Sequence, residues 1–107
     1  PLGSNFMKGD KLNLTITYTT NDKSTAVSWM TKEQTHDKTM PYLYTQCEDI
    51  ACRSIAPLQD TPASKFTWEA RILAPTQYKV YMSANSTSNA TLNATHHEWN
   101  FNCSIPV

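Results

Sequence analysis

Residues 41–48 read Pro-Tyr-Leu-Tyr-Thr-Gln-Cys-Glu, and their alternation predicts a β-strand around which the rest of the chain is organised. One face of this strand carries Tyr42, Tyr44, Gln46 and Glu48. Gln46 and Glu48 would then stand side by side, about 6.6 Å apart along the strand. An amide and a carboxylate at this spacing can hold one small cation, such as the terminal amine of a peptide. The alternative is a strand end whose two polar side chains are solvated.

A short helical turn and a corner are expected after this strand. Asp49 is placed to cap the turn and to pair with Arg53, four residues later. Pro57 ends the turn because proline lacks a backbone donor. Asp60 invites a catalytic interpretation, but an aspartate among turn residues more often accepts hydrogen bonds from backbone amides. We therefore expect Asp60 to have a structural role.

Alternating segments before this block predict a hairpin. Residues 11–19 alternate between apolar and polar side chains, as in a strand with one buried face. The apolar face would consist of Leu12, Leu14, Ile16 and Tyr18. After a turn at 20–24, residues 26–30 form a shorter strand that is expected to pair back onto residues 11–19.

The C-terminal half predicts a second set of strands. Residues 65–74 form a long strand, and residues 78–84 return after a turn as its partner. A loop or a weak strand pair is expected at 84–95, and a last strand at 96–103 with Trp99 and Phe101 on one face. The predicted fold class is all-β: a mostly antiparallel, sandwich-like sheet with one short helical turn after the strand that ends in Gln46 and Glu48.

Composition narrows the classes of partner. The 107 residues carry a formal net charge of zero, so there is no electrostatic case for a nucleic acid or a membrane surface as partner. A spanning segment needs about 18 consecutive apolar residues, and the chain has no such run. Residues 1–4, Pro-Leu-Gly-Ser, resemble the scar of a cleaved affinity tag, which leaves residues 5–107 for the fold.

The stretch PYLYTQCEDIACRSIAPLQDTPASKFTWEA resembles the N-terminal β-domain of the M1 (gluzincin) family of zinc aminopeptidases, in its leukotriene A4 hydrolase branch. The stretches GDKLNLTITYTT, WMTKEQT and YMSA resemble matching pieces of that domain in the same order. The resemblance covers nearly all of residues 6–107 and is weakest from 83 to 102. It implies a piece of the N-terminal domain that stops before the catalytic domain.

The resemblance also implies roles for two residues. The positions that match Gln46 and Glu48 line the substrate cleft in the family and help to hold the free α-amino group of the peptide. The leukotriene A4 hydrolase branch has glutamine at the second position, whereas the wider family usually has glutamate. Glu48 therefore favours an ordinary aminopeptidase over an epoxide hydrolase. The resemblance further implies zinc in the parent enzyme, a peptide substrate, a separate catalytic domain and a cytoplasmic location.

Catalytic and metal-binding motifs are absent from the sequence itself. A gluzincin needs H-E-x-x-H, but the three histidines are His36, His96 and His97, and they show no such spacing. Adjacent residues of a strand point to opposite faces, so His96 and His97 are not placed to chelate one ion. We expect no catalytic residue and no cofactor in this chain, which would be inert alone.

The cysteines and the glycosylation sequons indicate different cellular compartments. Cys47, Cys52 and Cys103 are odd in number and show no C-x-x-C pair, so we expect reduced, buried thiols. Five N-x-[ST] sequons instead suit a secreted protein. They begin at Asn13, Asn85, Asn89, Asn93 and Asn102.

Two other function classes remain open beside the peptidase fragment. One is a β-rich protein-interaction module without a peptidase role, and the other is a β-sandwich ectodomain, which only the sequons support. In the relatives a long apolar strand follows at about residue 107, so the chain is expected to expose a sheet edge there. We therefore expect concentration-dependent self-association.

Overall fold

A computed structural model gives the structure of the chain and describes residues 5–107. The expected tag scar at 1–4 lies outside the described residues. The chain divides into two compact units, Pro1–Asp60 and Thr61–Val107, which are described separately. Each unit holds one antiparallel sheet, and the only helices in the described part are two single turns. The all-β prediction is confirmed.

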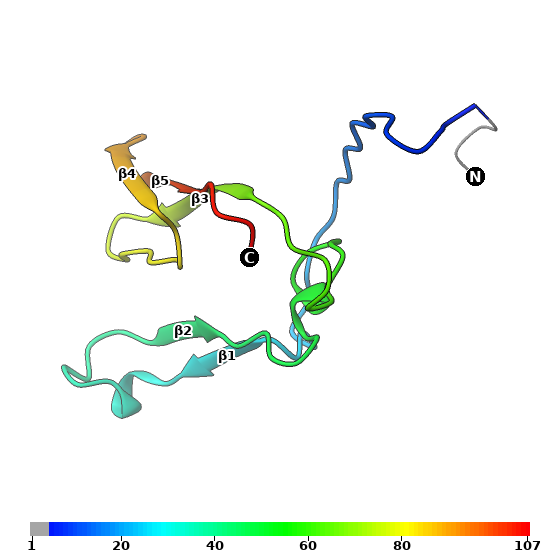
Figure 1. The fold of residues 1–107 in the computed structure, drawn as a ribbon. Coiled ribbons are helices and arrows are strands. Elements are labelled where there is room, and N and C mark those ends of the chain that lie inside the picture. Colours follow the sequence, from blue (N-terminus) through cyan, green and yellow to red (C-terminus); the bar gives the residue numbers. More distant parts are fainter. Residues whose placement is uncertain (1–4) are drawn as a thin grey trace. The chain divides into compact units, whose positions relative to one another are not determined.

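The first unit contains a two-stranded sheet (Figure 1). Strand β1 (Val27–Met30) pairs with β2 (Tyr42–Thr45) so that Val27 faces Thr45 and Met30 faces Tyr42. The connection between them contains the 3-10 helix η1 (Lys32–Gln34), where the side chain of Gln34 accepts a hydrogen bond from the backbone of Thr31 at 2.9 Å. The predicted strand at 26–30 is confirmed, but its partner is β2.

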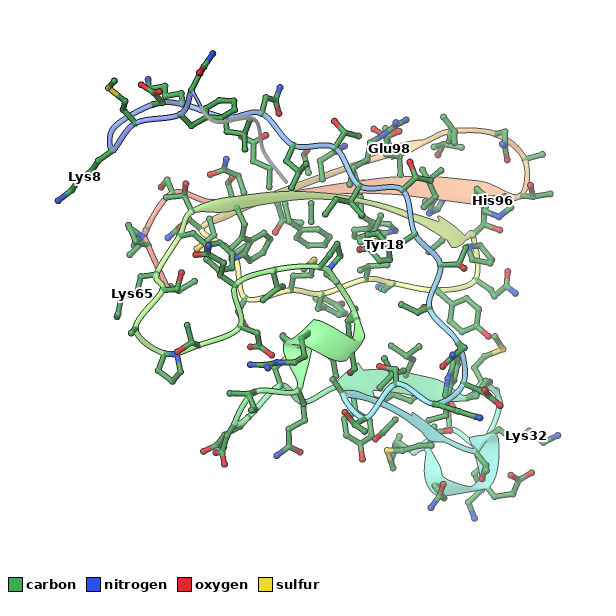
Figure 2. All side chains as sticks on the ribbon, turned by 90° about the vertical axis from the view of Figure 1, so that its right-hand side faces the viewer. Lys8, Tyr18, Lys32, Lys65, His96 and Glu98 are labelled. Atoms are coloured by element: carbon green, nitrogen blue, oxygen red, sulfur yellow. A yellow bond between two sulfur atoms is a disulfide. The ribbon has the colours of Figure 1, made fainter. Side chains whose placement is uncertain are left out.

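Residues 11–19 form no strand, contrary to the prediction. Their alternating apolar side chains are exposed: Leu12 by 49%, Leu14 by 67%, Ile16 by 47% and Tyr18 by 52%. The side chain of Tyr18 extends from a ribbon without an arrow (Figure 2). Alternation stabilises a strand only where another backbone accepts its hydrogen bonds, and no described segment pairs with residues 11–19.

The second unit contains a three-stranded sheet in the order β3-β5-β4, with both pairings antiparallel (Figure 1). Its strands are β3 (Trp68–Pro75), β4 (Ser86–Thr91) and β5 (His96–Cys103). The strands predicted at 65–74 and 96–103 are confirmed. The prediction that residues 78–84 pair with the first of them is wrong, because β5 lies beside β3 and β4 covers the other side of β5.

The core of the second unit lies on one face of this sheet. Ala74, Trp99 and Phe101 form its buried centre, and Phe101 is only 3% exposed. The flanking apolar side chains that pack against this centre are Trp68, Ala70, Ile72, Tyr78, Val80 and Ala84. Residues 78–84 therefore contribute side chains to the core instead of a paired backbone. Burying each large apolar side chain contributes about 1.5–3 kcal/mol, so the central strand β5 carries much of the stability of the unit.

No helix in the described part of the chain has the length and apolar character needed to span a bilayer.

Candidate functional site

The loop of residues 46–54, called here the 46–54 loop, follows β2 and carries both predicted site residues. Strand β2 ends at Thr45, three residues earlier than predicted, although the backbone N–H of Gln46 still donates to the Ala26 carbonyl at 2.9 Å. The N–H of Ala51 then donates to the Cys47 carbonyl at 2.8 Å, which closes a turn. Glu48 lies in that turn, so strand alternation does not set its direction.

The side chains of Gln46 and Glu48 are both exposed. Neither makes a side-chain hydrogen bond or ion pair with another described residue. A carboxylate and a carboxamide thus remain available two positions apart on one loop. Ionised carboxylates accept hydrogen bonds from ammonium groups, and amide oxygens do the same more weakly.

A disulfide between Cys47 and Cys52 closes this loop. The expectation of reduced thiols is therefore wrong for this pair and confirmed for Cys103, which is free and buried. The turn between the two cysteines brings their Cα atoms to 4.6 Å, within the range that a disulfide can bridge. Sequence spacing gave no sign of this approach, because it depends on how the turn at 48–51 closes.

Asp60 holds the segment that follows the disulfide, the 3-10 helix η2 (Cys52–Ser54). Its carboxylate accepts the backbone N–H of Arg53 at 2.8 Å and lies 3.4 Å from the Arg53 Nε. The guanidinium of Arg53 also donates to the Asp60 carbonyl at 2.7 Å. The structural role predicted for Asp60 is confirmed. The predicted pairing of Asp49 with Arg53 is wrong, and so is the Asp49 cap, because Ala51 precedes the first turn of η2.

Ser54 connects η2 to the beginning of β1. Its hydroxyl donates to the Ala51 carbonyl at 2.7 Å and accepts the backbone N–H of Ala26 at 3.2 Å. Because its one proton is used in this way, the hydroxyl of Ser24 at 2.9 Å acts as a donor toward it and fills its second acceptor position, while the hydroxyl of Thr25 lies farther away at 3.4 Å. Sequence reasoning missed Ser54, since a serine bonding back along a short helix is common and nothing local indicates a partner 28 residues away.

The histidines do not form a metal site in the described part of the chain. No group of three or more histidine, cysteine or acidic side chains there is placed to hold a metal ion. His96 instead lies with its Nδ1 at 2.8 Å from the hydroxyl of Thr95, at the start of β5. The residues of the described part therefore do not fit a zinc site.

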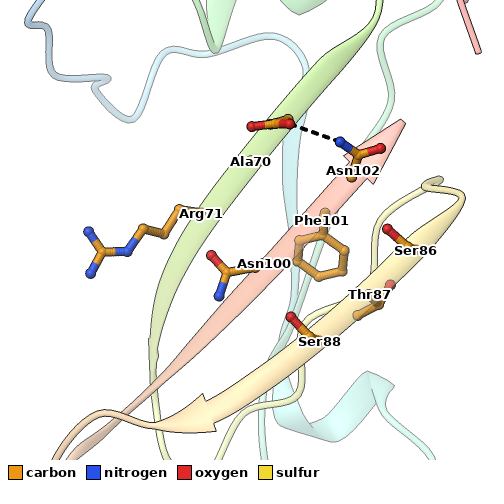
Figure 3. A pocket seen from close by; sticks show the side chains of 9 residues that line it. Ala70, Arg71, Ser86, Thr87, Ser88, Asn100, Phe101 and Asn102 are labelled. Carbon is orange, nitrogen blue, oxygen red and sulfur yellow. Dashed lines mark hydrogen bonds between the residues drawn. The ribbon is translucent and has the colours of Figure 1, made fainter. Parts of the chain in front are cut away.

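The polar face of the three-stranded sheet has a shallow hollow of about 500 Å³ (Figure 3). Asn102 donates to Glu69 across it at 2.9 Å, and Arg71 and Asn100 both donate to Glu98, at 2.5 Å and 3.1 Å. The guanidinium of Arg71 lowers the pKa of Glu98, and the same bond raises the pKa of Arg71. These polar groups already bond to one another, and the two predicted site residues do not line the hollow.

Comparison with known proteins gives a match over nearly the whole chain. The family model described as Peptidase M1 N-terminal domain matches residues 2–107. A leukotriene A-4 hydrolase of Xenopus laevis is 43% identical over 77 residues, which are 72% of this chain and 13% of that protein. A leukotriene A-4 hydrolase homolog of Botryotinia fuckeliana is 48% identical over 68 residues, 64% of this chain and 10% of that protein.

Another relative carries a different name. Leucine aminopeptidase 2 of Sclerotinia sclerotiorum is 48% identical over 68 residues, 64% of this chain and 11% of that protein. The chain thus spans about a tenth of the length of the curated relatives that it matches.

Proposed function

Because this chain belongs to the peptidase M1 N-terminal domain family, we propose that it is a non-catalytic part of a zinc aminopeptidase similar to leukotriene A4 hydrolase. Its role there is to help bind the free N-terminus of the peptide substrate, through Gln46 and Glu48. Zinc, the catalytic residues and the rest of the substrate cleft belong in this proposal to other parts of a longer polypeptide. The cytoplasmic location of such an enzyme is part of the same proposal.

One observation carries this proposal: the exposed carboxylate of Glu48 has no cationic partner in the described residues, although the loop around it is well held. A glutamate whose only role is to keep a surface loop hydrated does not require the loop to be fixed in one position. The disulfide and the bonds from Ala26 and Ser54 limit how far Glu48 can move. A substrate ammonium could therefore be bound without a large loss of loop entropy.

In this proposal, the carboxylate of Glu48 would also select for substrates with a free amine. A substrate with an ammonium group satisfies Glu48, whereas a ligand without that group leaves a desolvated charge unpaired. Gln46, two positions earlier, would supply a second acceptor through its side-chain oxygen.

Replacement of Glu48 in the full-length enzyme tests this role. Glu48→Ala should raise KM for aminoacyl substrates by about 30-fold or more, because a charge pair loses one partner. The inhibition constant of a des-amino analogue, which lacks the ammonium group, should not rise. Steady-state kinetics with the two ligands measure both quantities.

Glu33 provides the matched control. It is another exposed glutamate of the first unit, on η1, and its carboxylate makes no bond to a described side chain. Glu33→Ala should change KM by less than about twofold. If Glu48→Ala has no larger effect than Glu33→Ala, Glu48 does not bind the amine and the proposal fails.

A further inference from the structure

The 46–54 loop is attached to the beginning of β1 by two hydrogen bonds that converge on Ala26. The carbonyl of Ala26 accepts the N–H of Gln46 at 2.9 Å, and its own N–H donates to the Ser54 hydroxyl at 3.2 Å. Ala26 is only 1% exposed, so water does not replace either bond. The first and last residues of the 46–54 loop are thus attached to the same buried residue.

This arrangement places Glu48 between two fixed points. Gln46 is held by its backbone, and Ser54 is held by its side chain. Inside the loop, the disulfide joins Cys47 to Cys52, and Ser54 bonds back to the Ala51 carbonyl at 2.7 Å. Of these attachments, the hydroxyl of Ser54 is the one side-chain group that connects the end of the loop to the beginning of β1 through a buried backbone N–H.

We infer that Ser54 is a positioning residue for substrate binding: its hydroxyl fixes the 46–54 loop on Ala26 and so sets where Gln46 and Glu48 meet the substrate amine. The inference rests on the proposed function of Glu48. Ser54 itself touches no substrate in this arrangement. Its loss should therefore weaken the binding of the ammonium group and leave the chemical step unchanged.

The test uses the full-length enzyme with Ser54→Ala. KM for aminoacyl substrates should rise by about tenfold, since misplacement of a binding group by about 1 Å is costly. The turnover number kcat should change by less than about twofold, and the inhibition constant of a des-amino analogue should stay the same. Ser54→Thr keeps the hydroxyl and should restore KM to the value of the unmodified enzyme.

Hydrogen exchange supplies a readout that does not depend on activity. The amides of Ala26 and Gln46 should exchange faster in Ser54→Ala than in the unmodified enzyme, and Ser54→Thr should restore their protection. Ser24→Ala is the matched control, because it removes a hydroxyl bonded to Ser54 and leaves the bond from Ala26 in place. This control should change KM by less than about twofold. If Ser54→Ala does not fold, Ser54→Cys, with a much weaker acceptor of similar size, is measured by the same criteria.

A double-mutant cycle separates the two proposals. If Ser54 acts through Glu48, Ser54→Ala should raise KM little further in an enzyme that already carries Glu48→Ala. A normal KM in Ser54→Ala, beside a raised KM in Glu48→Ala, overturns the inference about Ser54 alone. Fully additive effects overturn it as well. A normal KM in Glu48→Ala overturns the proposed amine site, and the inference with it.

Discussion

At the scale of single residues, the polar side chains of this protein fall into two groups. Some are bonded to other residues of the chain, as Asp60 is to Arg53 and Glu98 is to Arg71. Others, Gln46 and Glu48, are exposed and unpaired among the described residues. Sequence patterns singled out Gln46, Glu48 and Asp60 near a strand end or a turn, but not Arg71 or Glu98. They did not identify the partner of either satisfied carboxylate, which lies 7 residues away for Asp60 and 27 residues away for Glu98.

The Arg71–Glu98 pair predicts how stability depends on pH. The bond from Arg71 lowers the pKa of Glu98 below its ordinary value of 4.5, so folding is favoured while Glu98 is charged. This contribution is complete above the ordinary value. It is lost as the pH falls from there through the lowered pKa, because the unfolded chain takes up the proton first.

The measurement is the urea midpoint of the unmodified chain and of Glu98→Gln between about pH 3 and pH 7. The difference in stability between the two should be largest at neutral pH and should shrink below pH 4.5. A difference that does not change with pH would show that the charge of Glu98 does not contribute.

At the scale of elements, an alternating pattern predicts a strand, but whether the strand forms depends on a partner backbone. Strand β5 was predicted with its full extent because Trp99 and Phe101 alternate with polar residues, and the structure buries that face. Residues 11–19 show an equally clear alternation and form no strand, because no described backbone pairs with them. The helical turn after β2 was expected. The aspartate that pairs with Arg53 was expected to be Asp49, whereas it is Asp60.

Two aspartates near η2 allow a direct comparison. Asp60→Ala should lower the free energy of unfolding by about 1–2 kcal/mol, because the Arg53 amide and guanidinium both lose an acceptor. Asp49→Ala should change it by less than about 0.5 kcal/mol, since Asp49 is exposed and makes no side-chain bond to a described residue. Urea denaturation of the two variants measures the difference. A larger loss in Asp49→Ala would favour the pairing that sequence spacing suggested.

At the scale of the whole molecule, the second unit presents an unprotected sheet edge. All six residues of β4 are exposed, and none of them is charged or a proline. Charges and prolines are the usual means by which edge strands avoid pairing with other chains. The end of the chain was expected to be the exposed edge, yet Val107 exchanges two backbone hydrogen bonds with Phe66, both at 3.2 Å. Strand β4 is therefore the better candidate for self-association, which stays a proposal.

Sedimentation of this 107-residue chain tests it. The weight-average mass should rise with concentration, and Ala90→Lys should reduce the rise by placing a charge on the β4 edge. Position 90 faces Glu98 across the sheet, so a lysine there has an acidic neighbour and should be tolerated. Thr76→Lys, in the turn after β3, adds the same charge away from β4 and should not reduce association. A constant monomer mass at all concentrations would contradict self-association through this edge.

The sequence by itself determined the all-β class, the family and the strands β1, β2, β3 and β5, with β2 shorter than predicted. These depend on local alternation and on a matching motif, both of which can be read along the chain. Only the tertiary structure decided that Cys47 bonds to Cys52, that Asp60 holds Arg53, that Ser54 reaches Ala26, and that residues 11–19 have no partner in the described part. The physical reason is that a hydrogen bond or a disulfide depends on how the backbone turns and on which segments it brings together, and a one-dimensional pattern does not contain that distance.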